Sequence, residues 1–117
     1  MATIRRANVP TGETGTSVIR WAPLAKGDEG EAIRFSQCAD KSAHVYGTFG
    51  GAAVRLEGCN DDGGDWQPLT DVQGVALDFT AAKLKQVTEI AREVRPRVIG
   101  GDESTSLTVA LCMRQQR

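Results

Sequence analysis

Aromatic residues, histidine and long apolar runs are all scarce in this chain of 117 residues. Aromatic side chains make up 5% of it, so we expect a core built mainly of Val, Leu, Ile and Ala. The one histidine, His44, leaves almost no ligands for a zinc site. No apolar run approaches the roughly 20 residues that cross a bilayer. Neither a metal, nor a cofactor, nor a membrane partner is therefore expected.

The cysteines and the N-terminus point to a reducing compartment. The N-terminal residues contain no apolar segment of the kind found in secretory signals, so synthesis in a cytoplasm is expected. There are three cysteines, Cys38, Cys59 and Cys112, and none belongs to a CxxC pair. An odd number in such a chain predicts free thiols rather than a disulfide framework. Sequence spacing leaves a catalytic pair of His44 with one of the thiols open, but nothing in the pattern favours it.

Charge is nearly balanced overall, at −1, but it is unevenly distributed. Residues 51–80 hold one Arg and six acidic residues, whereas residues 81–117 hold seven Lys or Arg and four acidic residues. Such asymmetry suits self-association or docking on a charged surface. The basic end lacks the dense Lys/Arg clusters with interleaved aromatics that mark nucleic-acid binders, so no nucleic-acid partner is expected.

Short alternating segments dominate the chain. Residues 1–16 are polar, contain Pro10 and show no periodicity, which predicts an extended N-terminal arm before a single domain over residues 17–117. Segments rich in β-branched residues and bounded by turn residues predict strands at 17–24, 31–38, 43–49, 52–59, 66–69, 75–80, 94–100 and 106–113. In the strand at 94–100, Pro96 cannot donate a hydrogen bond, which predicts an edge or a bulge there.

One segment has helical spacing. In residues 81–94, Leu84, Val87, Ile90 and Val94 recur at intervals of three and four, and Thr80 precedes them as a possible N-cap. The complete pattern predicts an all-β fold. We expect an antiparallel β-sandwich or jelly roll of about seven to eight short strands with one short helical segment.

The segment LEGCNDDGGDWQPLTD, residues 56–71, is the strongest candidate for a functional site. A calcium loop, a catalytic carboxylate pair and a tight turn are the alternatives. The acids do not match the ligand spacing of an EF-hand, and adjacent acids in one loop seldom face each other across a cleft. The tight turn is favoured, with Asn60, Asp62, Gly63 and Gly64 forming it. Trp66 is predicted to anchor this loop by packing on the apolar side chains Val54, Leu56, Leu69 and Leu77.

A wider resemblance rests on GTFGGAAVRLEGCNDDGGDWQPLTDVQGVALDFT together with VRPRVIGGDESTSLTVAL. These segments resemble small structural proteins of tailed bacteriophages and prophages, of the capsid decoration or cement type. The likeness runs from about residue 18 to the end. The fragment LEGCNDDGGDWQPL is also similar, more loosely, to discoidin-like carbohydrate-binding sandwiches.

The phage resemblance implies a β-sandwich without catalytic residues. It implies a place on the capsid surface of a virion made in a bacterial cytoplasm, with the major capsid protein and further copies of the chain as partners. The N-terminal arm is expected to supply contacts through Ile4, Arg5, Arg6, Val9 and Pro10. A tail or head–tail junction subunit and a discoidin-like carbohydrate-binding module are the alternatives.

Overall fold

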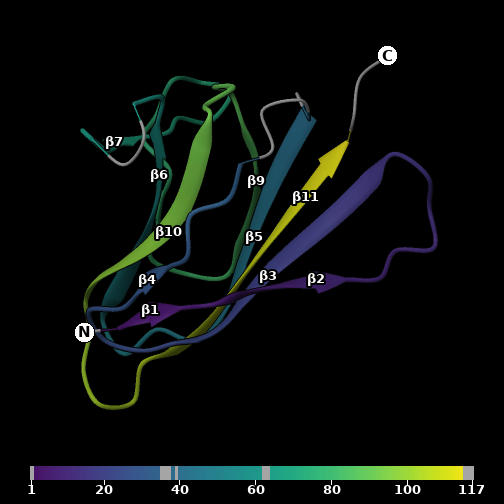
Figure 1. Cartoon of the computed structure of the whole chain (residues 1–117). Coiled ribbons are helices and arrows are strands. Elements are labelled where there is room, and N and C mark those ends of the chain that lie inside the picture. The colour runs from purple at the N-terminus through teal and green to yellow at the C-terminus, as the bar shows by residue number, and fades with distance from the viewer. Residues whose placement is uncertain (1, 35–37, 39, 62–63, 115–117) are drawn as a thin grey trace.

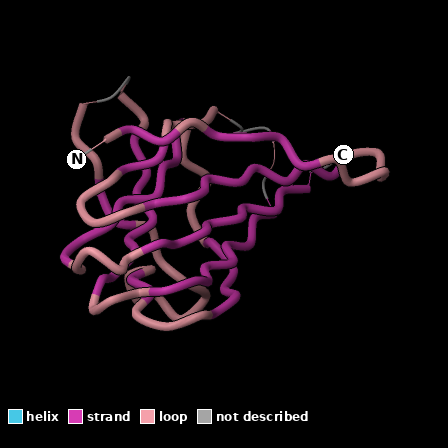
Figure 2. The backbone as a smooth tube through the Cα atoms, turned by 90° about the horizontal axis from the view of Figure 1, so that it is seen from below, coloured by secondary structure: helices cyan, strands magenta, loops and turns pink. Residues whose placement is uncertain are grey.

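Two β-sheets packed face to face form the protein in a computed structural model (Figure 1). The structure describes residues 2–34, 38, 40–61 and 64–114. Within these ranges every regular element is a strand, and the rest is loop (Figure 2). The all-β, sandwich-like architecture expected from the sequence is therefore present, with 11 strands among the described residues rather than seven or eight.

The first sheet, called sheet A, has six strands. Their order is β1 (Thr3–Ile4), β4 (Glu29–Gly30), β10 (Glu93–Gly100), β6 (Ala52–Cys59) and β7 (Gln67–Pro68), and β8 (Asp78–Phe79) pairs separately with β6. Only the short pair of β1 and β4 is parallel among these described strands. The centre of the sheet is the eight-residue ladder of β6 and β10, which runs from Glu93 opposite Cys59 to Gly100 opposite Ala52.

The second sheet, sheet B, has five antiparallel strands. Their order is β2 (Arg6–Val9), β3 (Thr16–Leu24), β11 (Ser106–Arg114), β5 (Asp40–Thr48) and β9 (Lys83–Val87). The central strand β11 pairs along its whole length with β5 and most of its length with β3. The register of β3 and β11 shifts between Leu107 and Val109, close to Pro23, so β3 continues through this proline to Leu24 instead of ending there.

Alternation of side chains explains why these segments form strands. In β11, Leu107, Val109, Leu111 and Met113 are all 0% exposed, while the residues between them face outward. The same period of two buries Ile19 and Trp21 of β3, Ala43 and Val45 of β5, and Val54 and Leu56 of β6 between the sheets. The resulting core is aliphatic, as the composition predicts, and Trp21 is its largest fully buried side chain.

Gly30 and Pro96 leave room for the buried side chain of Trp21. A Cβ at Gly30 would lie 2.6 Å from the Pro96 ring and 2.7 Å from Cδ1 of Trp21, so only glycine fits between them. The indole N–H of Trp21 donates to the carbonyl of Glu31 at 2.9 Å, which satisfies its one polar atom.

Pro96 lies in an interior strand of sheet A, at a position where the pairing of β10 with β4 requires no N–H donor. The N–H groups of Val94 and Val98, two residues away on each side, donate toward the segment that contains β4. The nitrogen of Pro96 therefore faces the same side, between these two bonds, where β4 pairs with β10 only at Arg97. The edge or bulge expected from the sequence is therefore wrong: β10 lies between β4 and β6, and its ladder with β6 runs past Pro96 without a register shift.

The helix predicted for residues 81–94 is wrong. Residues 83–87 form strand β9, which pairs with β5, and Glu93 and Val94 begin β10 in the other sheet. Of the four residues with helical spacing, Leu84 and Ile90 are 65% and 56% exposed, and Val87 and Val94 are buried in different sheets. Thr80 therefore caps no helix. The β-branched content of the segment and its pairing with β5 decide the structure.

The remaining strand predictions are mostly confirmed. The segments expected at 17–24, 43–49, 52–59, 94–100 and 106–113 are strands β3, β5, β6, β10 and β11 with boundaries within a few residues. Those at 66–69 and 75–80 are reduced to the two-residue strands β7 and β8. In the segment at 31–38, Ile33 forms an isolated bridge with Val94, and residues 35–37 lie outside the described residues.

The segment predicted as an arm joins both sheets at one end of their strand order (Figure 1). Residues 3–4 form β1 at the edge of sheet A, and residues 6–9 form β2 at the edge of sheet B. Backbone bonds from Glu29 N–H to Ala2 and from Glu31 N–H to Ile4 hold the first part. This segment is extended, and it pairs with strands of its own chain.

Candidate functional site

The acidic loop connects β6 to β7 and is held by hydrogen bonds within the loop and to the segment before β10. The carboxamide oxygen of Asn60 accepts the N–H of Arg92 at 2.8 Å. The N–H of Gly64 donates to the carbonyl of Asp61 at 2.9 Å, which closes a turn. Asp65 accepts a hydrogen bond from the Gln67 carboxamide at 2.8 Å. Two residues expected in the turn, Asp62 and Gly63, lie outside the described residues.

Trp66 does not pack into the core as the sequence predicted. It is half-buried, and the guanidinium carbon of Arg95 lies 4.1 Å from its ring centroid. This is the geometry of a cation–π contact. The tryptophan that fills the core is Trp21, which is 0% exposed. The alternation of Ile19 and Trp21 with polar or small residues in the segment 17–24 is the sequence pattern that indicates burial of Trp21.

Arg95 also binds two carboxylates on the outer face of sheet A. Its guanidinium lies 2.6 Å from Glu29 and 3.1 Å from Glu57, and Arg97 reaches Glu57 at 4.0 Å. The side chain of Glu57 is 5% exposed, so its charge depends on these partners. The loop residue Trp66 is thereby joined to a network of ion pairs that crosses β4, β10 and β6.

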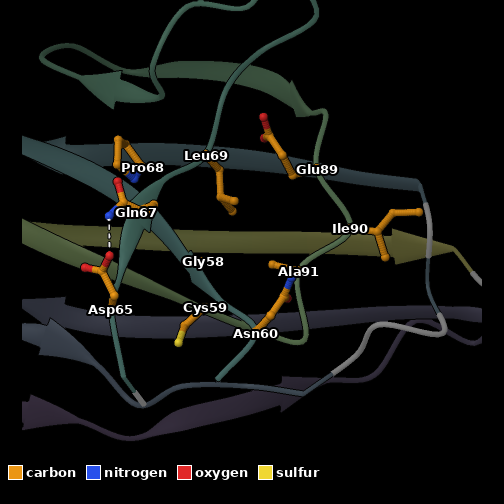
Figure 3. Close-up of a pocket in the computed structure, with 10 residues that line it drawn as sticks. All are labelled: Gly58, Cys59, Asn60, Asp65, Gln67, Pro68, Leu69, Glu89, Ile90 and Ala91. Carbon is orange, nitrogen blue, oxygen red and sulfur yellow. Dashed lines mark hydrogen bonds between the residues drawn. The ribbon is translucent and has the colours of Figure 1, made fainter. Parts of the chain in front are cut away.

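A depression of about 420 Å³ lies beside the acidic loop, between it and the segment that follows β9 (Figure 3). It is lined by Gly58, Cys59, Asn60, Asp65, Gln67, Pro68, Leu69, Glu89, Ile90 and Ala91. Glu89 is its most constrained carboxylate, since both oxygens accept hydrogen bonds from the N–H and hydroxyl of Thr70. Burial acts to raise the pKa of Glu89, but these bonds outweigh it and lower the pKa.

The polar side chains that line this depression form hydrogen bonds with the loops around it. Asn60 holds the backbone of Arg92, Asp65 holds Gln67, and Glu89 holds Thr70. The thiol of Cys59 accepts the N–H of Asp61 at 3.3 Å. The arrangement therefore fixes the turn between β6 and β7 and the crossing segment opposite it. Among the described residues no group of three or more His, Cys, Asp or Glu side chains is placed to hold a metal ion.

A second aspartate turn follows the loop. The carboxylate of Asp71 accepts the N–H groups of Gln73 and Val75, at 2.8 and 3.1 Å, and lies 3.5 Å from the Lys85 ammonium. The bonds from Val75 and Gln73 are the main reason why the pKa of Asp71 is lowered. This carboxylate is 8% exposed and ties the turn to strand β9.

The cysteines and the histidine lie in separate environments. Cys38 and Cys59 are buried, Cys112 is exposed, and all are free thiols. The rings of His44 and Tyr46 are in tilted contact, with 4.8 Å between their centroids, on the outer face of sheet B. The strand register makes Cys112 a diagonal neighbour of His44, but no hydrogen bond joins them in the described part of the chain. The thiol–imidazole pair that sequence spacing left open is therefore not formed.

The residues expected to contact a partner are distributed over the two edge strands β1 and β2 and the positions beside them. Ile4 packs against the core, and the N–H of Arg6 donates to the Glu31 carboxylate at 3.1 Å. Val9 is half-buried in β2, while Arg5 and Pro10 are exposed. The structure thus leaves Arg5 on the surface and uses Ile4 within its own fold.

The fold has counterparts among known structures. No family model and no curated protein sequence matches the chain. The SPBc2 prophage-derived protein YomS is similar in structure, with 14% sequence identity and a TM-score of 0.63, over 91% of this chain and 98% of that one. Recombinant oxalate oxidase in complex with glycolate is similar at 15% identity and a TM-score of 0.54, over 96% of this chain and 51% of that one.

A further similar structure is Peruvianin-I, a cysteine peptidase from Thevetia peruviana latex. It has 13% identity and a TM-score of 0.51, over 96% of this chain and 61% of that one. At such identities the likeness is one of fold, which hosts unrelated functions. The chain spans nearly the whole of the prophage-derived protein, about half of the oxalate oxidase chain and about three fifths of the Peruvianin-I chain. No helix of the described residues is long and apolar enough to cross a membrane.

Proposed function

We propose that this protein is a structural component of a bacteriophage virion and that it decorates the outer surface of the capsid. The observation that carries the proposal is the similarity of fold to a prophage-derived protein along 98% of that protein's length. The resemblance of the segments from Gly47 to Thr80 and from Val94 to Leu111 to phage decoration proteins points to the same role.

The chemistry of the acidic loop agrees with a structural role. Its polar groups bind neighbouring backbone and side chains, as described for Asn60 and Asp65. The Trp66 ring carries the Arg95 guanidinium on one side, so it is engaged within the protein. These contacts tie the loop to sheet A and give it a defined surface, which suits repeated docking on a shell. In this proposal the major capsid protein and neighbouring copies of the chain are its partners.

Many weak contacts explain how such a small protein would stabilise a shell. Each copy offers a limited area, and one interface of that size is weak by itself. Copies that bind the shell and one another at once gain avidity without any new kind of contact. The number of copies per particle is therefore the quantity that distinguishes this role from others.

The test is the copy number on purified particles. Particles of a phage that encodes the chain are separated by density, and the protein is quantified against the major capsid protein by gel densitometry. We expect a ratio near that of the capsid protein, and we expect particles made without the protein to lose their DNA at lower temperature. Adding the purified protein back should restore the heat resistance.

Other ratios or other ligands would contradict the proposal. About a dozen copies per particle would assign the protein to the tail or the head–tail junction instead. Absence from the particle, together with binding of the purified protein on a glycan array, would favour the carbohydrate-binding module.

A further inference from the structure

A shallow hollow on the outer face of sheet B has a basic rim. Its volume is about 310 Å³, and it is lined by Arg5, Ala7, Arg20, Ala22, Tyr46 and Thr108. These residues come from the N-terminal segment and from β3, β5 and β11, so neighbouring strands of one sheet form it (Figure 1). The hollow lies on the opposite sheet from the acidic loop and shares no residue with the depression beside that loop.

Strand register brings these residues together. Ala7 lies opposite Arg20, and Thr108 lies opposite Tyr46. Alternation along β3 turns Arg20 and Ala22 outward, while Trp21 between them is buried. Small side chains at Ala7, Ala22 and Thr108 form the floor, and the long side chains of Arg5, Arg20 and Tyr46 rise around it. The hollow is thus a direct result of side-chain size on a regular sheet.

The two arginines are available to a ligand. Arg5 and Arg20 are exposed, and neither forms an ion pair or side-chain hydrogen bond within the described residues. Arginines elsewhere in the fold have carboxylate partners, as Arg55 does with Asp78 and Arg114 with Asp40. No carboxylate lines the hollow, so its charge is of one sign.

We propose that this hollow binds an acidic segment of a partner protein, with carboxylates held by Arg5 and Arg20. A guanidinium presents a planar fork of donors that matches a carboxylate, and two of them favour a segment with at least two acidic side chains. Tyr46 is 38% exposed beside them and provides an apolar ring and a hydroxyl for the rest of the segment.

The shape favours a peptide over a small acidic molecule. Small-molecule sites enclose most of the ligand's surface, whereas this hollow is open along the sheet face. An extended chain can lie across the strands with its side chains between the arginines. The inference rests on this surface and does not depend on the proposed place of the protein in a virion.

Fluorescence anisotropy with a labelled, capped hexaglutamate peptide tests the site at low ionic strength. The variant Arg5→Gln/Arg20→Gln removes both guanidinium groups. The control is Lys26→Gln/Lys83→Gln, which changes net charge equally at two exposed positions outside the hollow. We expect the first variant to bind the peptide at least about tenfold more weakly than the parent and the control to stay within about twofold. Tyr46→Ala should also weaken binding, by a smaller factor.

Three results would overturn the inference. Equal weakening in the two double variants would show attraction to net charge alone. Undiminished binding by Arg5→Gln/Arg20→Gln would place the peptide elsewhere. Displacement of the peptide by inorganic phosphate or N-acetylneuraminic acid at similar concentration would show that the hollow does not select a peptide. Failure of the parent protein to be present on particles would refute the proposed function and leave the peptide result unchanged.

Discussion

The guanidinium of Arg95 is stacked on the ring of Trp66, 4.1 Å from its centroid, while it binds Glu29 and Glu57 at its edges. The tryptophan that follows the acidic loop is therefore fixed by a charge on the sheet face and not by the core. This relationship changes the expected consequences of mutations around the loop.

Replacement of the two tryptophans should have unequal effects. Trp21 is 0% exposed, so Trp21→Ala should lower the free energy of unfolding by about 3–5 kcal/mol. Trp66 is half-buried and mainly loses its contact with Arg95, so Trp66→Ala should lower it by about 0.5–2 kcal/mol. Urea unfolding of both variants measures the difference. Equal losses would mean that Trp66 belongs to the core after all.

Removal of Arg95 should be costly because it leaves a buried carboxylate. Arg95→Ala deprives Glu57, whose side chain is 5% exposed, of its nearest cation, and should lower the free energy of unfolding by about 3–5 kcal/mol. The matched control is Arg55→Ala, because Arg55 pairs with Asp78 at the surface and should contribute about 1 kcal/mol or less. If chemical denaturation shows the same loss for both variants, the burial of Glu57 does not govern the network.

The carboxylate of Asp71 should make stability depend on acid pH. Hydrogen bonds from Val75 and Gln73 lower its pKa below that of the unfolded chain. Its contribution to stability is therefore complete above the unfolded pKa of about 3.9 and is lost as the pH falls through the folded pKa. Asp71→Asn should be less stable than the parent at pH 7, and the gap should narrow below about pH 4.

Unfolding curves from pH 7 to pH 3 test this dependence. Glu103→Gln, an exposed position in the turn before β11, controls for the change in net charge. A gap between parent and Asp71→Asn that stays constant down to pH 3 would contradict the assigned hydrogen bonds.

Deletion of residues 1–9 should expose two sheet edges together. The deletion removes β1 from β4 and β2 from β3, and each lost hydrogen bond is worth about 0.5–1.5 kcal/mol. We expect a lower unfolding midpoint and association that increases with concentration, because unpaired strand edges recruit other chains. Thermal unfolding and sedimentation velocity, each compared with the full chain, provide the measurements. A deletion variant that stays monomeric at millimolar concentration would show that these strands do not protect the edges.

Much of the sheet structure could be predicted because alternation determines it locally. In β6 and β11 every second residue is apolar, and the turns between strands carry Gly, Asp and Asn, so sequence and packing agree. The helix prediction for the segment 81–94 failed because contacts with other parts of the chain determine its structure. Leu84 and Ile90 have helical spacing, yet they remain exposed because β5 and the loop that carries Asp71 set the position of β9.

The candidate site could be predicted only in part. Short-range bonds, such as Gly64 to Asp61, follow from the loop sequence itself. The contact of Trp66 depends on Arg95, which is far along the chain, and the hollow beside Arg5 depends on residues of β3, β5 and β11; pairing of the strands brings each set together. The sequence places several arginines in the chain, but it does not show which of them have carboxylate neighbours.

The N-terminal segment forms edge strands that could be exchanged between copies of the protein. Residues 3–9 complete one edge of each sheet, and only Arg5 lies between the strand in sheet A and the strand in sheet B. An identical segment from another copy would satisfy the same hydrogen bonds, since the receiving edges of β3 and β4 are unchanged. A closed monomer and a series of copies joined by exchanged segments would then share one set of contacts, and protein concentration would select between them.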